Sequence, residues 1–167
     1  IKFSPDGKSL ATGGQDKLAK LWDWLKSNEL KSFTGHKGAV TSIEFSSDGS
    51  MLSTGSNDTS IRMWDVSTAE VKKELNGHRL AVRSVAISPD GKMLASAGSD
   101  DMVKLWNISS GSNTKTYIDH SNRVTAVAFS VDSQQLLSAS EDSTVRVRDL
   151  SKENASQVLS EIGRAHV

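Results

Sequence analysis

The chain has 167 residues, within the ordinary range of a single domain, and 36% of them are hydrophobic and 24% charged. Its longest apolar runs are only a few residues, far below the roughly 20 that a membrane-spanning helix needs, so no membrane segment is expected. The 20 basic residues balance the 20 acidic ones, which argues against a general binder of nucleic acid or membranes, and the lack of cysteine excludes disulfides and cysteine metal sites.

Short strand-like runs separated by polar turns begin at the first residue. In the first turn, Ser4-Pro5-Asp6-Gly7, proline presets the second position of a type I turn and glycine suits the fourth. The third run alternates, with Leu21 directed to one face and Trp22 to the other. The expected strands of this part are 1–3, 9–13, 18–23 and 29–33.

The same succession of short runs continues to the end of the chain. The expected strands are 39–45, 51–55, 61–64, 71–75, 82–87, 93–97, 103–106, 115–118, 124–129, 135–139, 145–149 and 157–159. No stretch shows a convincing helical pattern. Pieces of this length with turn residues between them are typical of an all-β sandwich, barrel or propeller.

A fixed period distinguishes among these folds. Gly35-His36 opens a unit that Trp64-Asp65 closes, and Gly77-His78 follows 42 residues later (77 − 35 = 42). Four strands of about five or six residues, with their turns, fill such a unit, which is then one four-stranded antiparallel sheet. A sheet this small must stack on its neighbours, and stacked twisted sheets fan into a propeller. We therefore predict an all-β propeller fragment of about four four-stranded blades, with repeats at 1–34, 35–76, 77–118 and 119–160.

These repeated Gly-His and Trp-Asp pairs resemble those of the WD-repeat β-propellers, and the resemblance covers residues 1–159. It implies a hydrogen-bonded tetrad of histidine, hydroxyl, aspartate and tryptophan within each repeat. In the second and third repeats the tetrads would be His36, Thr54, Asp58 and Trp64, and His78, Ser96, Asp100 and Trp106. The first repeat retains Thr12, Asp16 and Trp22, and the fourth retains His120, Ser138 and Asp142.

A histidine, a hydroxyl and an aspartate in one cluster also match the composition of a hydrolase triad. Two observations favour a structural role. The constellation occurs three times with similar neighbours, whereas catalysis needs one exposed site, and each hydroxyl lies within an alternating strand instead of on an exposed turn. In the structural role, an indole N–H donates to the hydroxyl, the hydroxyl to imidazole, and imidazole to the carboxylate.

The fourth repeat departs from the pattern at several positions. Asp119 replaces the usual glycine, Arg148 replaces tryptophan, and Val131 and Ser133 replace the proline and glycine of the first turn. We interpret these changes as drift, with the alternative that Arg148 exposes a charge to a partner. Because Ser138 would lose the indole, we expect the fourth repeat to be the least stable complete one.

The resemblance implies a scaffold for protein–protein interaction rather than an enzyme, with protein or peptide partners and no cofactor, metal or small-molecule substrate. Candidate contact residues are Gln15, Asn57, Ser99, Glu141, Ala39, Thr41, Ala81, Arg83, Arg123 and Thr125. The two arginines favour acidic or phosphorylated partners. The alternatives are that these are solvated loop residues, or that the chain is a sensor or regulatory domain of a larger enzyme. The lack of cysteine fits an intracellular location, in the cytoplasm or the nucleus.

Two further predictions concern the ends of the chain. The first residue is Ile1 and lies inside a repeat, so we expect that the true N-terminus is missing. Residues 161–167, EIGRAHV, match no part of the repeat and resemble the translation of a common sequencing adapter, so they are left out of the fold. Most members of the resembled family have seven blades, so a partial ring with uncovered faces is expected to self-associate.

Overall fold

The computed structural model describes residues 1–152 and 156–160, and within them the chain forms β-strands and no helix. The strands are β1 (Lys2–Phe3), β2 (Leu10–Gly13), β3 (Ala19–Asp23), β4 (Asn28–Phe33), β5 (Val40–Phe45), β6 (Met51–Ser56), β7 (Ile61–Asp65), β8 (Val71–Leu75), β9 (Val82–Ile87), β10 (Met93–Gly98), β11 (Val103–Asn107), β12 (Asn113–Tyr117), β13 (Val124–Phe129), β14 (Gln135–Ser140), β15 (Thr144–Asp149) and β16 (Ser156–Ser160). No helix of the described part is therefore long and apolar enough to cross a membrane. The suspected tail at 161–167 lies outside the described residues.

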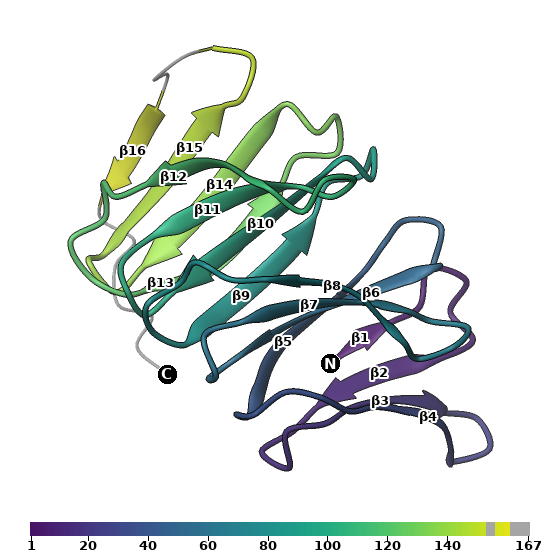
Figure 1. The fold of residues 1–167 in the computed structure, drawn as a ribbon. Coiled ribbons are helices and arrows are strands. Elements are labelled where there is room, and N and C mark those ends of the chain that lie inside the picture. The colour runs from purple at the N-terminus through teal and green to yellow at the C-terminus, as the bar shows by residue number, and fades with distance from the viewer. Residues whose placement is uncertain (153–155, 161–167) are drawn as a thin grey trace, which may run out of the picture.

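Each group of four consecutive strands forms one antiparallel sheet in chain order. The sheets β1–β4, β5–β8, β9–β12 and β13–β16 follow one another from the purple to the yellow end of the chain (Figure 1). The prediction of four four-stranded antiparallel blades is confirmed. β12 begins two residues before its expected position and ends at Tyr117, because the register pairs Val103 with Tyr117 and leaves Ile118 in the following loop, 72% exposed.

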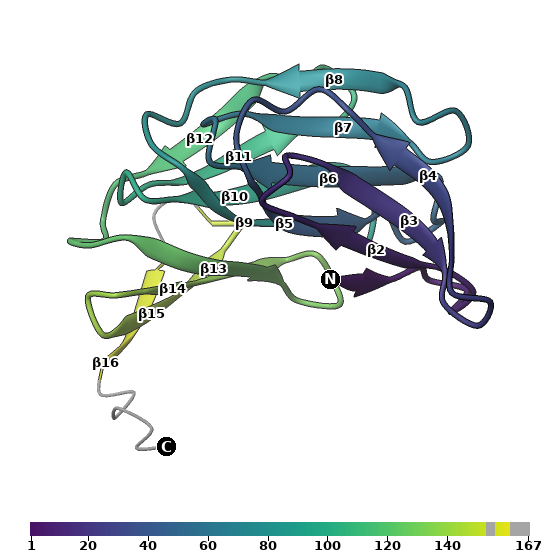
Figure 2. The ribbon, with the colours of Figure 1, turned by 90° about the horizontal axis from the view of Figure 1, so that it is seen from below.

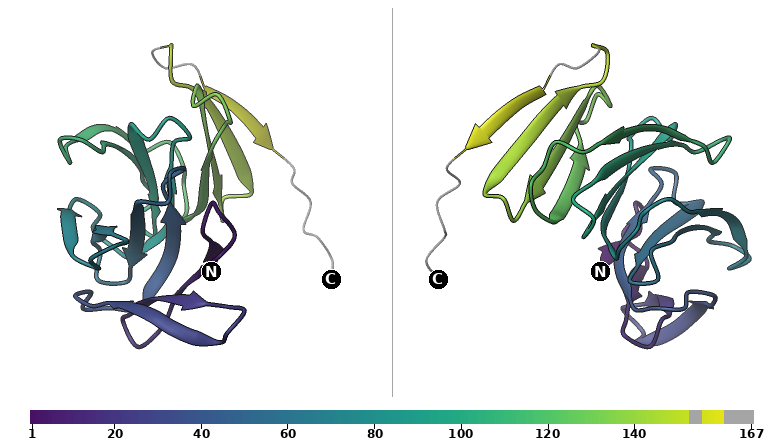
Figure 3. Two further views of the ribbon diagram at one scale, coloured as in Figure 1. Left: turned by 90° about the vertical axis from the view of Figure 1, so that its right-hand side faces the viewer. Right: turned by 60° about the vertical axis from the view of Figure 1, so that its left-hand side comes forward.

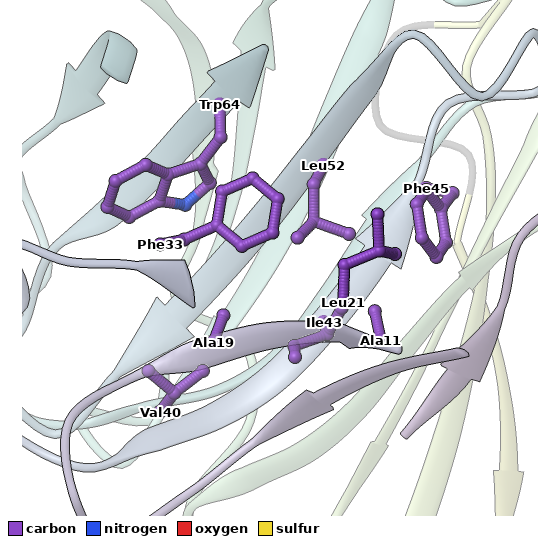
Figure 4. Packing of buried hydrophobic residues seen from close by; sticks show 9 residues of the cluster. All are labelled: Ala11, Ala19, Leu21, Phe33, Val40, Ile43, Phe45, Leu52 and Trp64. Atoms are coloured by element: carbon purple, nitrogen blue, oxygen red, sulfur yellow. The ribbon is translucent and has the colours of Figure 1, made fainter. Parts of the chain in front are cut away.

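The hydrophobic core lies between successive sheets rather than within one. In the first junction, Phe33 of β4 points toward the indole of Trp64 on β7, with ring centroids 5.7 Å apart (Figure 4). Similar apolar clusters fill the second and third junctions. Apolar residues of successive sheets meet in these junctions, so units that recur every 42 residues stack on one another.

The inner strands approach closely at positions that admit no side chain. A Cβ on Gly13 would lie 2.6 Å from the Cγ1 of Val40 on the next sheet, and a Cβ on Gly55 would lie 2.6 Å from the Cγ1 of Val82. Contacts of this length are too short for a real Cβ, so glycine is required there. The tight inner packing lets the sheets fan outward from their inner strands.

The two outermost sheets are covered on one face only in the described part of the chain. The sheet β13–β16 lies at one end of the arrangement and β1–β4 at the other (Figures 2 and 3). Ala126 and Ala128 are exposed on β13, and Phe3 on β1 is 58% exposed. Both end faces are therefore apolar surfaces that remain accessible.

The altered turn of the fourth repeat keeps the conformation of its equivalents. Ser133 adopts φ 60°, in the same left-handed region as Gly91 with φ 71° in the preceding repeat. Its hydroxyl accepts a hydrogen bond from the Asp90 N–H at 3.2 Å, which joins the turns of adjacent sheets. The serine therefore adopts a backbone conformation that glycine adopts more easily, and it gains a hydrogen bond to the adjacent sheet.

Candidate functional site

In the second repeat, four side chains form one continuous hydrogen-bonded chain. The indole Nε1–H of Trp64 donates to the Oγ1 of Thr54 at 2.8 Å. Thr54 Oγ1 lies 2.7 Å from the Nε2 of His36, whose Nδ1 lies 2.9 Å from the Oδ2 of Asp58. The Nδ1–H tautomer of His36 satisfies every group, with the hydroxyl donating to Nε2. Thr54 has no exposed surface, so this chain is a buried strut across the sheet.

The third repeat contains the same strut. Trp106 Nε1–H donates to Ser96 Oγ at 2.9 Å, His78 Nε2 lies 2.8 Å from that oxygen, and His78 Nδ1 lies 3.0 Å from Asp100. Ser96 is completely buried and its hydroxyl is fully engaged, so a substrate could not reach it. This burial argues against the hydrolase alternative, because a nucleophile must be accessible.

The first repeat contains part of the arrangement. Trp22 Nε1–H donates to Thr12 Oγ1 at 2.8 Å. Asp16 is exposed and accepts the N–H of Leu18 at 3.2 Å, which closes the turn between β2 and β3. In this sheet, the Trp22–Thr12 pair and the Asp16 turn share no described hydrogen bond.

The fourth repeat replaces the indole with a guanidinium. His120 Nδ1 lies 2.8 Å from Asp142 and its Nε2 lies 2.8 Å from Ser138 Oγ. Arg148 donates through Nη1 to Ser138 Oγ at 2.7 Å and through Nη2 to Asp119 Oδ1 at 2.7 Å. Ser138 loses the indole, as expected, but keeps a donor, because Nη1 of the arginine takes the position of the indole N–H.

The alternative that Arg148 exposes its charge is also wrong. Its side chain is 2% exposed, and Asp119 supplies the carboxylate that a buried guanidinium needs. Sequence reasoning treated the changes at 119 and 148 as separate events and missed the ion pair. The available signal was that two opposite charges replace two neutral residues within one repeat.

Burial and hydrogen bonding set the ionisation of the strut residues. Burial lowers the pKa of His36, and the nearby Asp58 only partly offsets this effect, so the imidazole is neutral at pH 7. Burial alone would raise the pKa of Asp58, but hydrogen bonds from Ser60, the Lys37 N–H and His36 outweigh it and hold the pKa well below its ordinary value. The strut therefore combines a neutral imidazole with an ionised carboxylate.

The aspartate of each strut also fixes two loops at the same end of the sheet. Asp58 Oδ2 accepts the N–H of Lys37 at 2.7 Å, and its Oδ1 accepts the N–H of Ser60 at 3.0 Å. Asp100 and Asp142 bond the N–H groups of Arg79 and Ser121 in the same way. The residue after each aspartate or its equivalent has a left-handed φ, at Lys17, Thr59, Asp101 and Ser143. Because non-glycine residues rarely adopt this conformation, these turns are tightly constrained.

The predicted contact residues come from two places, the turns before the strut aspartates and the starts of the first strands. The structure brings these two sets together at this end of the sheets. Backbone hydrogen bonds join Asn57 N–H to Ala39 O at 2.9 Å, Ser99 N–H to Ala81 O at 2.8 Å and Glu141 N–H to Arg123 O at 2.9 Å. We call this surface the loop face. It comprises Gln15, Asn57, Ser99, Glu141, Ala39, Thr41, Ala81, Arg83, Arg123 and Thr125.

The residues of the loop face differ in how free their side chains are. Gln15, Asn57, Glu141 and Arg123 are exposed. Arg83 is exposed, and its Nε–H donates to Ser99 Oγ at 2.7 Å. The Thr41 hydroxyl bonds the carbonyl of Val82 on the next sheet, and Ala39 and Ala81 are half-buried, so these three support the surface more than they present it.

The described residues of this face hold no candidate metal cluster. In residues 1–152 and 156–160, no three or more His, Asp or Glu side chains group as potential metal ligands. The face offers guanidinium, amide and carboxylate groups on constrained loops. Such an arrangement is suited to recognising another surface.

The comparisons with known proteins agree with this geometry. A family model described as "WD domain, G-beta repeat" matches residues 1–23, 27–65, 69–107 and 111–149. Over 44 residues the chain is 39% identical to Periodic tryptophan protein 2 homolog of Dictyostelium discoideum, which is 26% of this chain and 5% of that protein. Over 42 residues it is 40% identical to human Pre-mRNA-processing factor 19, which is 25% of this chain and 8% of that protein.

A third relative is U3 snoRNP-associated protein-like YAOH of Oryza sativa subsp. japonica, 37% identical over 43 residues, or 26% of this chain and 8% of that protein. The matched stretches have the length of one repeat. They cover less than a tenth of each curated relative.

Proposed function

Since this chain belongs to the WD-repeat family, we propose that it is a non-enzymatic scaffold whose loop face binds protein or peptide partners. We assign residues 1–160 to this single repeat domain. WD-repeat architecture supports the general role of an interaction scaffold, and the choice of the loop face as the contact surface is our inference.

The observation that carries the proposal is the coupling between the buried struts and the loop face. Each strut aspartate bonds two loops, and the adjoining residue, such as Asn57 or Glu141, presents an exposed side chain. Constrained loops lose little conformational entropy on binding, so the surface is pre-organised. A solvated loop without a binding role would need no such constraint.

The charge of the face favours an acidic or phosphorylated partner. Arg83 and Arg123 are exposed at equivalent edges of adjacent sheets, and guanidinium groups bind carboxylate and phosphate in a bidentate manner. Ser99 already holds the Nε–H of Arg83, which leaves the Nη groups to be offered to a ligand. Two relatives are named for pre-mRNA processing and for a U3 ribonucleoprotein, so we infer a protein partner inside the cell, within an assembly that contains RNA.

Site-specific photo-crosslinking tests the proposal. A photoreactive amino acid at position 57 or 141, two exposed positions of the loop face, is expected to capture a partner in cells, whereas the same group at Lys92, exposed in a turn at the opposite end of β10, captures none of it. Charge reversal by Arg83→Glu and Arg123→Glu should abolish the capture, and Lys92→Glu should not. Identical products from all three positions, with thermal stability unchanged, would refute the loop face as the contact surface.

The second candidate is a regulatory domain of a larger enzyme or signalling protein. The matched stretches cover only a small part of each relative, which leaves room for other domains in those proteins. Sequencing the full gene distinguishes the two candidates. A kinase or nucleotide-binding motif in the same reading frame would favour the regulatory domain, and further repeats alone would favour the scaffold.

A further inference from the structure

The third junction between sheets differs from the first two at one position of the 42-residue period. Phe33 packs on Trp64 in the first junction, and Leu75 shares a cluster with Trp106 in the second. The equivalent residue of the third junction is Tyr117, whose ring lies 4.5 Å from the guanidinium of Arg148. An apolar contact with an indole has become a cation–π contact with an arginine.

A pocket lies beside this guanidinium at the outer edge of the junction. The pocket has a volume of about 200 Å³ and is lined by Lys115 and Tyr117 of β12, by Arg148 and Asp149 of β15, by Ser156 of β16, and by Asp119 and Lys152. Small-molecule sites usually measure roughly 300–1,000 Å³, so this pocket suits one small group rather than a cofactor. None of the loop-face residues lines it, so the pocket is separate from the proposed partner surface.

A lysine that closes the first two junctions is directed into this pocket in the third. Lys31 donates to the carbonyl of Ser67 on the next sheet, and Lys73 donates to the carbonyl of Ser109 at 2.6 Å. Lys115 follows Lys73 by 42 residues but makes no such bond to a described residue. Its Nζ lies 5.2 Å from the ring of Tyr117 instead.

The charges around the pocket do not balance within the described residues. Asp119 pairs with Arg148 at 2.7 Å and with Arg146 at 3.5 Å, and Asp149 pairs with Lys152 at 2.8 Å. Four cations (Lys115, Arg146, Arg148 and Lys152) surround the two described carboxylates of Asp119 and Asp149; Arg146 pairs with Asp119 but does not line the pocket itself. The Nε–H of Arg148 is buried and has no described partner, and the same holds for the Nε–H groups of Arg62 and Arg146. Lys115 is half-buried and Lys152 is largely exposed, so the excess of positive charge attracts an anion from solvent.

We propose that this pocket binds a phosphate monoester. The charge of such a group, about −1.5 to −2 at neutral pH, matches the excess of two cations, and its three oxygens accept several charge-assisted hydrogen bonds. The Nε–H of Arg148 and the ammonium groups of Lys115 and Lys152 are the donors. Lys152 is 71% exposed at its side chain, so the entrance faces solvent and the ester can be part of a larger molecule.

Titration of the full chain with inorganic phosphate and with O-phosphoserine tests the site. The arginine Nε–H signals in ¹H–¹⁵N NMR report on it, and the signal of Arg148 is identified by its loss in the Arg148→Trp, Asp119→Gly double variant. This variant restores the glycine and tryptophan of the third repeat. We expect saturable shifts of the Arg148 signal with both probes, and no binding by the double variant, which stays folded.

Matched lysine variants make the test specific. Lys115→Met should weaken binding about tenfold, the loss expected for one hydrogen bond to a charged group. Lys73→Met, which removes the equivalent lysine of the preceding junction, should leave the affinity unchanged. Equal affinities of the two variants, the same shifts with sodium chloride at equal ionic strength, or binding of inorganic phosphate without O-phosphoserine would overturn the proposal.

Discussion

The ion pair between Asp119 and Arg148 allows a sharp prediction about stability. Replacing Asp119 with glycine removes the carboxylate that lies 2.7 Å from Arg148 Nη2, while the guanidinium remains 2% exposed. Replacing Arg148 with tryptophan in the same chain then restores the residue types of Gly77 and Trp106 in the third repeat. We expect the single change to destabilise the protein and the second change to reverse most of the loss.

The size of the effect follows from the burial of the two partners. Removing one partner of a fully buried ion pair costs about 3–5 kcal/mol. Asp119 is 35% exposed at its side chain, so water can reach its site and the expected loss for Asp119→Gly falls to about 2–3 kcal/mol. In the double variant no buried charge lacks a partner, and the coupling between the two sites is therefore about 2 kcal/mol.

Urea denaturation of the wild type, both single variants and the double variant measures this coupling. Glu29→Ala is the matched control, because Glu29 pairs with Lys20 at 3.0 Å while both side chains are partly exposed, so its loss of stability should be clearly smaller than that of Asp119→Gly. Additive effects of the two changes, or an Asp119→Gly loss no larger than that of Glu29→Ala, would show that the pair does not replace the indole strut.

Three further predictions follow from the structure. Amide hydrogens of 145–147 should exchange faster than those of 61–63, because the last sheet is covered on one face only in the described chain; equal protection would contradict this. The pKa of Asp58 is held below its ordinary 3.8, so the ionised carboxylate stabilises the fold at neutral pH, and this stabilisation is lost as the pH falls below about 4. Asp58→Asn should therefore flatten the fall of unfolding free energy with decreasing pH in denaturation measurements, and an unchanged slope would exclude the effect. The chain should self-associate in sedimentation, and Ala126→Lys on the open face should reduce this; a monodisperse wild-type monomer would count against it.

Much of the fold could be predicted from the sequence because its signals are local and repeated. Alternation within runs such as 124–129 locates the strands, and the turn residues between them are polar. The 42-residue period then shows that each unit is one sheet and that neighbours stack. An error arose at Ile118, because an apolar residue beside a strand cannot be told by pattern from one within it.

The contacts of the fourth repeat could not be predicted in the same way. Tyr117 belongs to the outer strand of the preceding sheet, and Asp119 and Arg148 are 29 residues apart. Asp119 and Arg148 meet within one repeat, but their proximity depends on how the loop before β13 folds over β15, and Tyr117 reaches Arg148 only because two sheets stack. The same limit applies to Thr41, whose bond to the carbonyl of Val82 crosses a sheet junction.

The loop face could be predicted in part. The positions next to the strut aspartates come from the family resemblance, and the 42-residue period places them at the same end of each sheet. Which of them present free side chains does not follow, because the engagement of Arg83 by Ser99 depends on side-chain geometry. The resemblance therefore located the surface, and the structure distinguishes its supporting residues from its exposed ones.

The stability of the fourth sheet gives no reason to prefer arginine over tryptophan at position 148. An indole satisfies the Ser138 hydroxyl with one N–H and needs no counter-ion, as Trp106 does for Ser96. The guanidinium requires Asp119 and still leaves its Nε–H without a described partner. A change at position 148 alone would leave the buried guanidinium without a carboxylate, whereas here Tyr117, Asp119 and Arg148 complement one another. A ligand that accepts from the remaining N–H would account for the whole set.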